Sequence, residues 1–103
     1  MIRHCVLLKF RNDVTRAERD ALYASLRALE GRIDGLLRGW YGANVSPEGL
    51  GQGFDEGFIM DFRDAAARDA YLVHPDHQAA GARLVAALEG GTRGLVVFDF
   101  ATG

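Results

Sequence analysis

The chain has 103 residues, and its 49% hydrophobic and 25% charged residues are typical of a globular protein. Fourteen acidic and twelve basic residues give a net charge of -2, which argues against nucleic acid as a partner because phosphate backbones attract basic surfaces. A chain of this length has room for one hydrophobic core, so we expect a single domain over residues 1–103.

The single cysteine and the N-terminal residues favour a reducing compartment. Cys5 has no partner for an internal disulfide, and sulfur is too scarce for a zinc site of Cys-x-x-Cys type. Arg3, His4 and Lys9 interrupt the first residues, which leaves no apolar run long enough for a signal peptide or a membrane span. We therefore expect a cytoplasmic protein with no membrane partner.

A strand and a long helix are predicted for the first third of the chain. Residues 2–10 are rich in apolar and β-branched side chains and predict the strand. Thr15 and Glu18 then have the spacing of a capping box, in which each side chain bonds to the backbone of the other residue. Leucines at helical spacing follow and predict a helix that stops near Gly31 or Gly35.

Two strands and the start of a second helix are predicted for the middle of the chain. Residues 36–45 and 56–62 predict the strands, and the glycine-rich segment between them predicts a loop. Asp64 can cap a helix that runs through Tyr71. This helix must break or kink at Pro75, whose ring would clash with the carbonyl of Tyr71.

The last part of the chain completes a ferredoxin-like order. A second helical segment is expected from Pro75, a favoured first helical position, to about Leu88, before the pair of glycines at 90 and 91. Residues 95–100 predict the last strand. The order is β-α-β-β-α-β with a split second helix, and it predicts an α+β fold of the ferredoxin-like class.

The first and last strands are apolar on both faces. Val6 and Leu8 alternate with Cys5 and Leu7, and residues 95–100 repeat the pattern. Two helical elements can cover only one face of a four-stranded sheet, so the other face needs a further layer. We expect a homodimer in which the second copy supplies that layer and forms a dimeric α/β barrel. The alternative is a monomer with an unusually apolar open face.

The densest group of reactive side chains is the segment from Tyr71 to His77. Pro75 excludes His74 from helical geometry and places His77 in the first turn of the next helix, where the helix dipole disfavours a cation. We expect His77 to be a neutral imidazole that can accept a proton, with Tyr71 as an orienting group or proton donor. The alternative is that the histidines satisfy backbone groups at the helix junction while Tyr71 packs in the core.

His4 and Asp99 are expected on the core-facing side of the sheet. A carboxylate buried there is costly unless it is paired, and the sequence predicts that Asp99 pairs with His4. Neither an isolated His4 nor the spacing of His74 and His77 across a proline matches a known metal motif. We therefore expect no metal site.

The chain resembles the stress-responsive dimeric α/β-barrel (Dabb) family over nearly its whole length. The resemblance is carried by the first strand, by Gly-Ala-Asn-Val-Ser at 42–46, by Tyr-Leu-Val-His-Pro-Asp-His at 71–77 and by Phe-Asp-Phe at 98–100. Tyr-x-x-His-Pro-x-His at the helix break is the most specific of these segments. The resemblance implies a homodimer of ferredoxin-like protomers, sheet against sheet.

A polyketide cyclase related to this family closes a linear polyketide by an intramolecular aldol condensation, without a metal or an organic cofactor. Its catalytic tyrosine and histidine match Tyr71 and His77, and its pocket histidine on the first strand matches His4. Other positions differ, because a pocket histidine of the cyclase corresponds to Glu56 and aromatic cavity positions are leucines here. The identity of the substrate therefore does not transfer.

Three functions are compatible with the resemblance. The first is binding of a small apolar or aromatic molecule by the homodimer, with an undefined physiological role. The second is a cofactor-independent cyclase or lyase that performs aldol-type ring closure with His77 and Tyr71 as catalytic residues. The third is a cofactor-independent monooxygenase, a class that shares the dimeric barrel architecture. We expect no cofactor and a pocket lined by His4, Val6, Leu8, Tyr23, Phe58 and His74.

Overall fold

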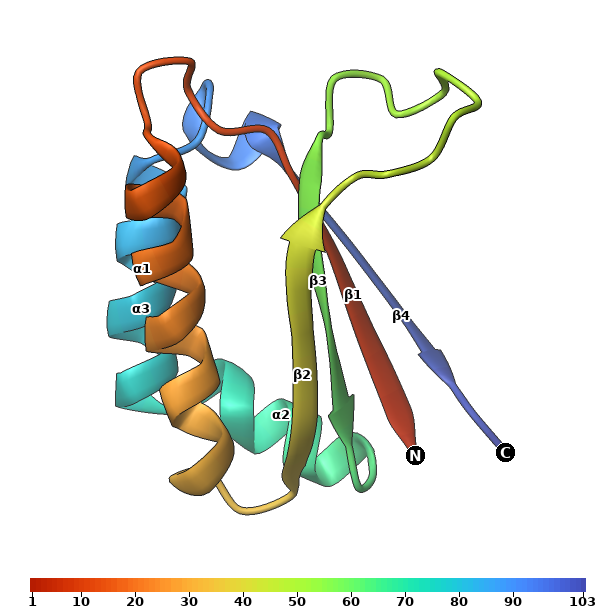
Figure 1. The fold of residues 1–103 in the computed structure, drawn as a ribbon. Coiled ribbons are helices and arrows are strands. Elements are labelled where there is room, and N and C mark those ends of the chain that lie inside the picture. Colours follow the sequence, from red (N-terminus) through yellow and green to blue (C-terminus); the bar gives the residue numbers. More distant parts are fainter.

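A four-stranded antiparallel sheet with its helices on one face makes up the computed structural model, which describes residues 1–103 (Figure 1). The strand order across the sheet is β2-β3-β1-β4, so the first strand lies between the third and the last. In chain order the elements are β1 (Ile2–Leu8), α1 (Arg16–Arg27), the 3-10 helix η1 (Ala28–Gly31), β2 (Leu36–Ala43), β3 (Glu56–Phe62), α2 (Ala65–Val73), α3 (Pro75–Ala86), the 3-10 helix η2 (Gly91–Gly94) and β4 (Leu95–Ala101).

This architecture confirms the predicted ferredoxin-like α+β fold and its element order. Strand β3 has the expected bounds, and the second helix is split into α2 and α3. At the split, His74 has an extended backbone with φ -69° and ψ 132°, and Pro75 lies in the first turn of α3. The ring of His74 accepts a hydrogen bond from the backbone N–H of Asp76 at 3.1 Å. The histidine therefore caps the helix that the proline opens.

Several elements are shorter than their sequence patterns. Strand β1 ends at Leu8, although the N–H of Lys9 still donates to the carbonyl of Gly94, just before β4, at 2.8 Å. Helix α1 begins with the predicted capping box but ends at Arg27, after which the chain tightens into η1.

No helix is both long and apolar enough to cross a lipid bilayer.

The hydrophobic core lies between the helices and one face of the sheet, which we call the inner face. Side chains alternate along a strand, so every second residue of β1 and β3 points toward the helices. The largest fully buried side chains come from both layers, and they are Tyr71, Phe62, Leu8, Leu26 and Met60. Packing across this layer holds α2 and α3 against the sheet on both sides of the break at Pro75.

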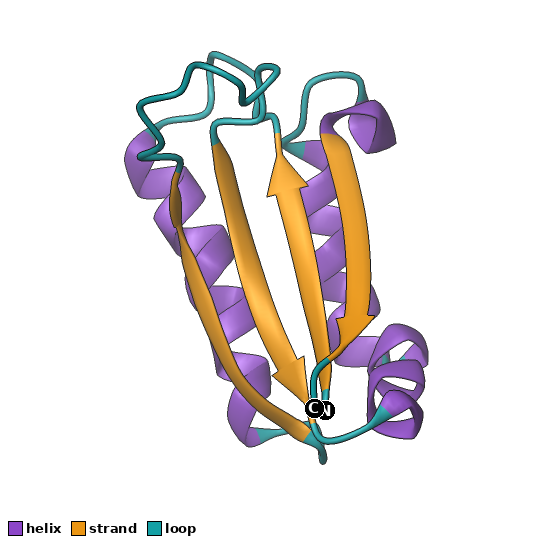
Figure 2. Ribbon diagram, turned by 90° about the vertical axis from the view of Figure 1, so that its right-hand side faces the viewer, coloured by secondary structure: helices purple, strands orange, loops and turns teal.

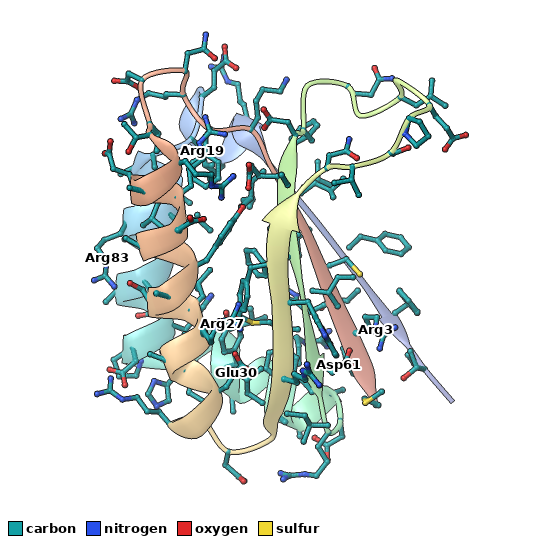
Figure 3. The ribbon with its side chains drawn as sticks, in the orientation of Figure 1. Arg3, Arg19, Arg27, Glu30, Asp61 and Arg83 are labelled. Atoms are coloured by element: carbon teal, nitrogen blue, oxygen red, sulfur yellow. The ribbon has the colours of Figure 1, made fainter.

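The opposite face of the sheet, the outer face, has no helix over it (Figure 2). Five large apolar side chains on it remain 39 to 64% exposed, and these are Leu7, Trp40, Val96, Phe98 and Phe100. Arg3 and Asp61 form a bidentate ion pair near one end of the face, in which two guanidinium nitrogens donate to the two carboxylate oxygens at 2.8 and 2.9 Å (Figure 3). Hydrogen bonds from Arg3 hold the pKa of the Asp61 carboxyl below its usual range. Because of the five exposed apolar side chains, the outer face of a single copy is an apolar surface of a kind that is rare on monomeric proteins.

Candidate functional site

A cavity of about 470 Å³ lies between helix α3 and the inner face of the sheet. We call it the helix-side cavity. Ten of its fourteen lining residues are hydrophobic. His4 from β1, Tyr71 from α2 and His77 from α3 bring acid–base groups into this apolar wall. Its size and composition are those of a site for a small organic molecule, since ligand pockets measure roughly 300 to 1,000 Å³ and are mostly apolar.

His77 is held so that one ring nitrogen is free. Its Nδ1 lies 3.3 Å from the carbonyl oxygen of Leu72, which can only accept a hydrogen bond, so Nδ1 carries the hydrogen. Nε2 is then the unprotonated nitrogen of the neutral ring, and it has no partner in the protein. Burial lowers the pKa of His77, and the nearby histidines His4 and His74 lower it further. The neutral imidazole that the helix position predicted is thus also favoured by its surroundings.

Tyr71 lies between the two other polar groups of the cavity. Its ring contacts the ring of His77 at 4.0 Å between centroids, with the two planes tilted by 38°, and it meets the ring of His4 edge-on at 6.1 Å. The side chain is 1% exposed and its hydroxyl has no hydrogen-bond partner, yet no fully buried polar side-chain atom lacks one. The hydroxyl therefore opens into the cavity. Burial raises the pKa of Tyr71, so the hydroxyl stays protonated and acts as a hydrogen-bond donor.

The expected pairing of His4 with Asp99 is present. The two residues are cross-strand partners in β1 and β4, and His4 Nδ1 lies 2.7 Å from Asp99 Oδ1. Arg68 of α2 donates to the other carboxylate oxygen at 2.8 Å. The sequence suggested the His4 contact because both residues share a sheet face, but it contained no signal for Arg68, which comes from another element.

The structure brings together only some of the residues expected at the pocket. Val6 and Phe58 line the helix-side cavity with the three polar residues, whereas Leu8, Tyr23 and His74 lie outside its wall. Leu8 is packed in the core, Tyr23 donates its hydroxyl to Glu56 at 2.7 Å, and His74 caps α3. Each of these three residues therefore already has a structural partner.

The rest of the cavity wall includes residues that the sequence analysis did not single out. Gln78, Gly81 and Val85 follow His77 along the same side of α3. Helical spacing from His77 could have identified Gly81 and Val85, which lie four and eight positions further along the helix, but not Gln78, which directly follows His77. Gly81 matters most, because a methyl group at its position would lie 3.8 Å from Nε2 of His77.

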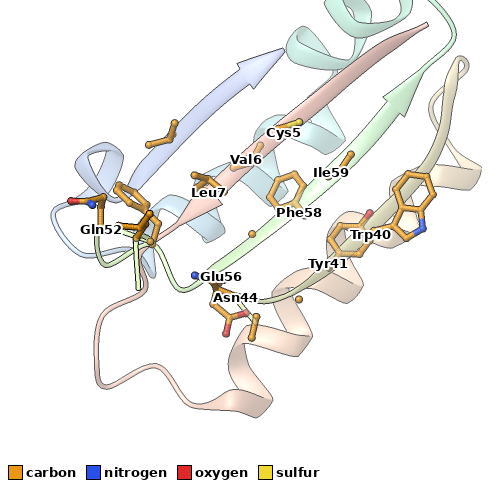
Figure 4. A pocket seen from close by; sticks show the side chains of 17 residues that line it. Cys5, Val6, Leu7, Trp40, Tyr41, Asn44, Gln52, Glu56, Phe58 and Ile59 are labelled. Carbon is orange, nitrogen blue, oxygen red and sulfur yellow. The ribbon is translucent and has the colours of Figure 1, made fainter. Parts of the chain in front are cut away.

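A second and larger hollow of about 660 Å³ lies on the outer face, beside the loop between β2 and β3 (Figure 4). Trp40, Leu7 and Ile59 contribute to its apolar floor, and none of the three histidines reaches it. Glu56 is the one carboxylate beside this hollow, and it is bound by Arg16 and Tyr23. The larger space therefore offers an apolar surface, whereas the acid–base groups meet in the smaller cavity.

No three side chains of histidine, cysteine, aspartate or glutamate lie together so that they could hold a metal ion.

The family of the protein is shown by a match that covers nearly the whole chain. The family model for the Stress responsive A/B Barrel Domain, Dabb, matches residues 2–102. The chain belongs to the Dabb family. This confirms the resemblance seen in its sequence.

Relatives of this Dabb protein include one with a solved structure and one with a named activity. A dimeric ferredoxin-like protein of unknown function from Jannaschia sp. CCS1 is 34% identical, with a TM-score of 0.90 over 98% of both chains. An uncharacterised protein of Streptomyces coelicolor is 42% identical over 82 residues, or 77% of this chain and 81% of its own. Olivetolic acid cyclase of Cannabis sativa is 21% identical over 80 residues, or 78% of this chain and 79% of its own.

Proposed function

We propose that this Dabb protein binds a small apolar or aromatic carbonyl compound in the helix-side cavity and removes a proton next to the carbonyl, as aldol-type ring closure of a polyketide requires. The observation that carries the proposal is the free Nε2 of His77 beside the unpartnered hydroxyl of Tyr71 in an otherwise apolar cavity. The distant likeness to olivetolic acid cyclase supports the same chemistry.

In the proposed reaction, Nε2 of His77 is the general base. It takes the proton from the carbon next to the carbonyl, and the electron pair of that C–H bond moves toward the carbonyl oxygen. The Tyr71 hydroxyl donates a hydrogen bond to this oxygen and stabilises the charge that develops there. Apolar walls such as Val6 and Leu84 hold the rest of the ligand and keep water away from the developing charge.

Binding without chemistry is the competing function, because the same apolar cavity would also hold an unreactive ligand. Exchange of carbon-bound protons separates the two functions. Acetophenone, an aromatic ketone small enough for the cavity, has a methyl group whose protons exchange slowly with deuterated water. A base at Nε2 accelerates this exchange, whereas a binding site alone does not.

We also propose that the protein is a homodimer through the outer face. A partner sheet would cover Leu7, Trp40, Val96, Phe98 and Phe100, which the monomer leaves in water. Covering this surface is favourable because each square ångström of buried apolar area contributes about 25 cal/mol. The relative from Jannaschia is described as dimeric, which supports the same arrangement.

Replacing Gly81 by alanine is expected to stabilise the protein and weaken ligand binding. Alanine is favoured over glycine inside a helix by about 1 kcal/mol, and the new methyl group meets nothing closer than His77 Nε2 at 3.8 Å. The same methyl group occupies the approach to that nitrogen. Denaturant unfolding should therefore give a higher midpoint, while calorimetric titration with acetophenone should give a lower affinity.

Gly31→Ala is the matched control. A methyl group there meets no atom within 4 Å and lies in η1, away from the helix-side cavity. This variant should bind acetophenone like the wild type. If Gly81→Ala stabilised the protein and also bound the ketone with unchanged affinity, the ligand would not approach Nε2 of His77, and the proposed site would be incorrect.

A further inference from the structure

The ring of His4 is fixed by a chain of charged groups from two other elements. Asp99 of β4 lies 2.7 Å from its Nδ1, and Arg68 of α2 donates to the second oxygen of that carboxylate at 2.8 Å. His4 is 5% exposed, while the side chains of Asp99 and Arg68 are 21% and 23% exposed. These three side chains thus form a hydrogen-bonded row from the protein surface to the wall of the helix-side cavity.

The Asp99 contact occupies Nδ1 and thereby determines that Nε2 is the nitrogen of His4 that faces the cavity. An ionised carboxylate can only accept, so the hydrogen of a neutral His4 ring is on Nδ1. Nε2 has no hydrogen-bond partner in the protein, and no fully buried side-chain nitrogen lacks one. Nε2 therefore opens into the cavity that His4 lines. Partners of this kind orient a ring and select its tautomer.

We propose that Asp99 and Arg68 are positioning residues that make His4 a second acid–base group, with its Nε2 acting on the same ligand as Nε2 of His77. This inference rests on the proposed function and assigns the group that protonates the carbonyl oxygen. The ring of Tyr71 lies between the two histidines, at 6.1 Å from His4 and 4.0 Å from His77 between centroids.

The surroundings of the two histidines assign them opposite roles. The charged or titratable groups around His4 are Asp99 from β4, Arg68 and Tyr71 from α2, and His77 from α3, whereas β3 contributes the apolar rings of Phe58 and Phe62. The Asp99 carboxylate is the only anion in contact with the ring, and it faces the positive charge that His4 carries when it acts as an acid. A charge on His4 in turn lowers the pKa of His77. Hence His4 is the acid and His77 is the base.

In the proposed reaction the two histidines exchange protons with the ligand in opposite directions. His77 Nε2 takes the proton from carbon, the C–H electron pair forms the carbon–carbon double bond of the enol, and the carbonyl π pair takes the proton of His4 Nε2. His4 becomes neutral and His77 becomes the cation. When the enol carbon attacks a second carbonyl, His77 gives its proton to the new alkoxide and the enol oxygen returns its proton to His4, so both rings are restored.

Nitrogen NMR of the histidine rings tests the inference without any ligand. The chain has three histidines, so long-range ¹H–¹⁵N spectra can be assigned with His74→Gln and His77→Gln variants. Neutral His4 should carry its hydrogen on Nδ1 in the wild type. Asp99→Leu should move the hydrogen to Nε2, and Arg68→Met should give a mixture of the two tautomers. Arg83→Met is the control, because Arg83 extends from α3 away from the sheet (Figure 3), and it should leave the His4 signals unchanged.

Acetophenone proton exchange supplies the second readout. Asp99→Leu should lower the exchange rate by about tenfold or more, with a circular dichroism spectrum like that of the wild type. If Asp99→Leu does not fold, Asp99→Asn replaces it: the amide oxygen keeps the Nδ1 hydrogen bond while the charge is lost, so the tautomer should persist and the exchange should still fall.

A wild-type His4 with its hydrogen on Nε2, or a tautomer unchanged in Asp99→Leu, would overturn the inference. A wild type that shows the Nδ1 tautomer but no accelerated exchange would instead contradict the proposed function. The two failures are therefore distinguishable.

Discussion

Replacing His77 by glutamine is expected to lower the catalysed exchange of acetophenone methyl protons by about 10²-fold or more, the range that a general base contributes. The imidazole Nε2 is the only unprotonated ring nitrogen at the α3 side of the cavity, and the glutamine amide is too weak a base to replace it. Binding of the ketone should change little because the apolar wall remains. Proton NMR in deuterated water measures the exchange.

The pH dependence of this exchange follows from the surroundings of His77. Burial lowers the pKa of His77 from its ordinary value of 6.5, so the ring is already neutral at pH values where a free histidine is half protonated. The exchange rate should stay constant as the pH falls through 6.5 and then decline through the lower pKa. A decline centred at or above 6.5 would contradict the desolvated environment.

Two variants separate the base from its neighbours. His74→Gln should keep most of the exchange activity, because His74 lies outside the cavity wall and serves as the cap of α3. Tyr71→Phe should lose about tenfold, because only the hydrogen bond to the carbonyl oxygen disappears. If His77→Gln exchanged the ketone protons as fast as the wild type, His77 would be eliminated as the base.

A Phe98→Glu substitution is expected to convert the proposed homodimer into monomers. Phe98 is 64% exposed on the outer face, in the middle of the edge strand β4 between Val96 and Phe100. A symmetric interface would contain two copies of the substitution, and each would replace about 2 kcal/mol of burial by a charge facing apolar side chains. The dissociation constant should rise by about 10³-fold or more. Sedimentation velocity over a range of concentrations measures it.

Val73→Glu is the matched control for the dimer. Val73 is 71% exposed, but it lies at the end of α2 on the helical layer rather than on the outer face. This variant should sediment like the wild type. A wild type that sediments as a monomer at high concentration, or a Phe98→Glu variant that remains dimeric, would show that the outer face is not the interface between copies.

The features predicted correctly from the sequence depend on local chemistry. The capping box at Thr15 and the break at Pro75 are encoded within a few residues, and the structure has both. The contact between His4 and Asp99 was predictable because two polar residues on the buried face of neighbouring strands must satisfy each other. These features also set the order of the elements and the place of the site.

The features that the sequence did not predict arise from packing between distant elements. Tyr23 was predicted to line the pocket, but its hydroxyl donates a hydrogen bond to the buried carboxylate of Glu56 and not to a group of the helix-side cavity. Hydrogen bonds from Arg16 and Tyr23 lower the pKa of Glu56 although burial alone would raise it. The space beside Gly81 and the reach of Arg68 to Asp99 likewise depend on how the helices lie on the sheet, which no short pattern encodes.

A crystal structure of the protein soaked with acetophenone tests the central claim most directly. We expect one ketone in the helix-side cavity of each protomer, with its carbonyl oxygen on the Tyr71 hydroxyl and its methyl carbon facing Nε2 of His77. The outer hollow, although larger, should hold no ketone, because the partner sheet covers it. A ketone bound in the outer hollow with the helix-side cavity empty would contradict the proposed site.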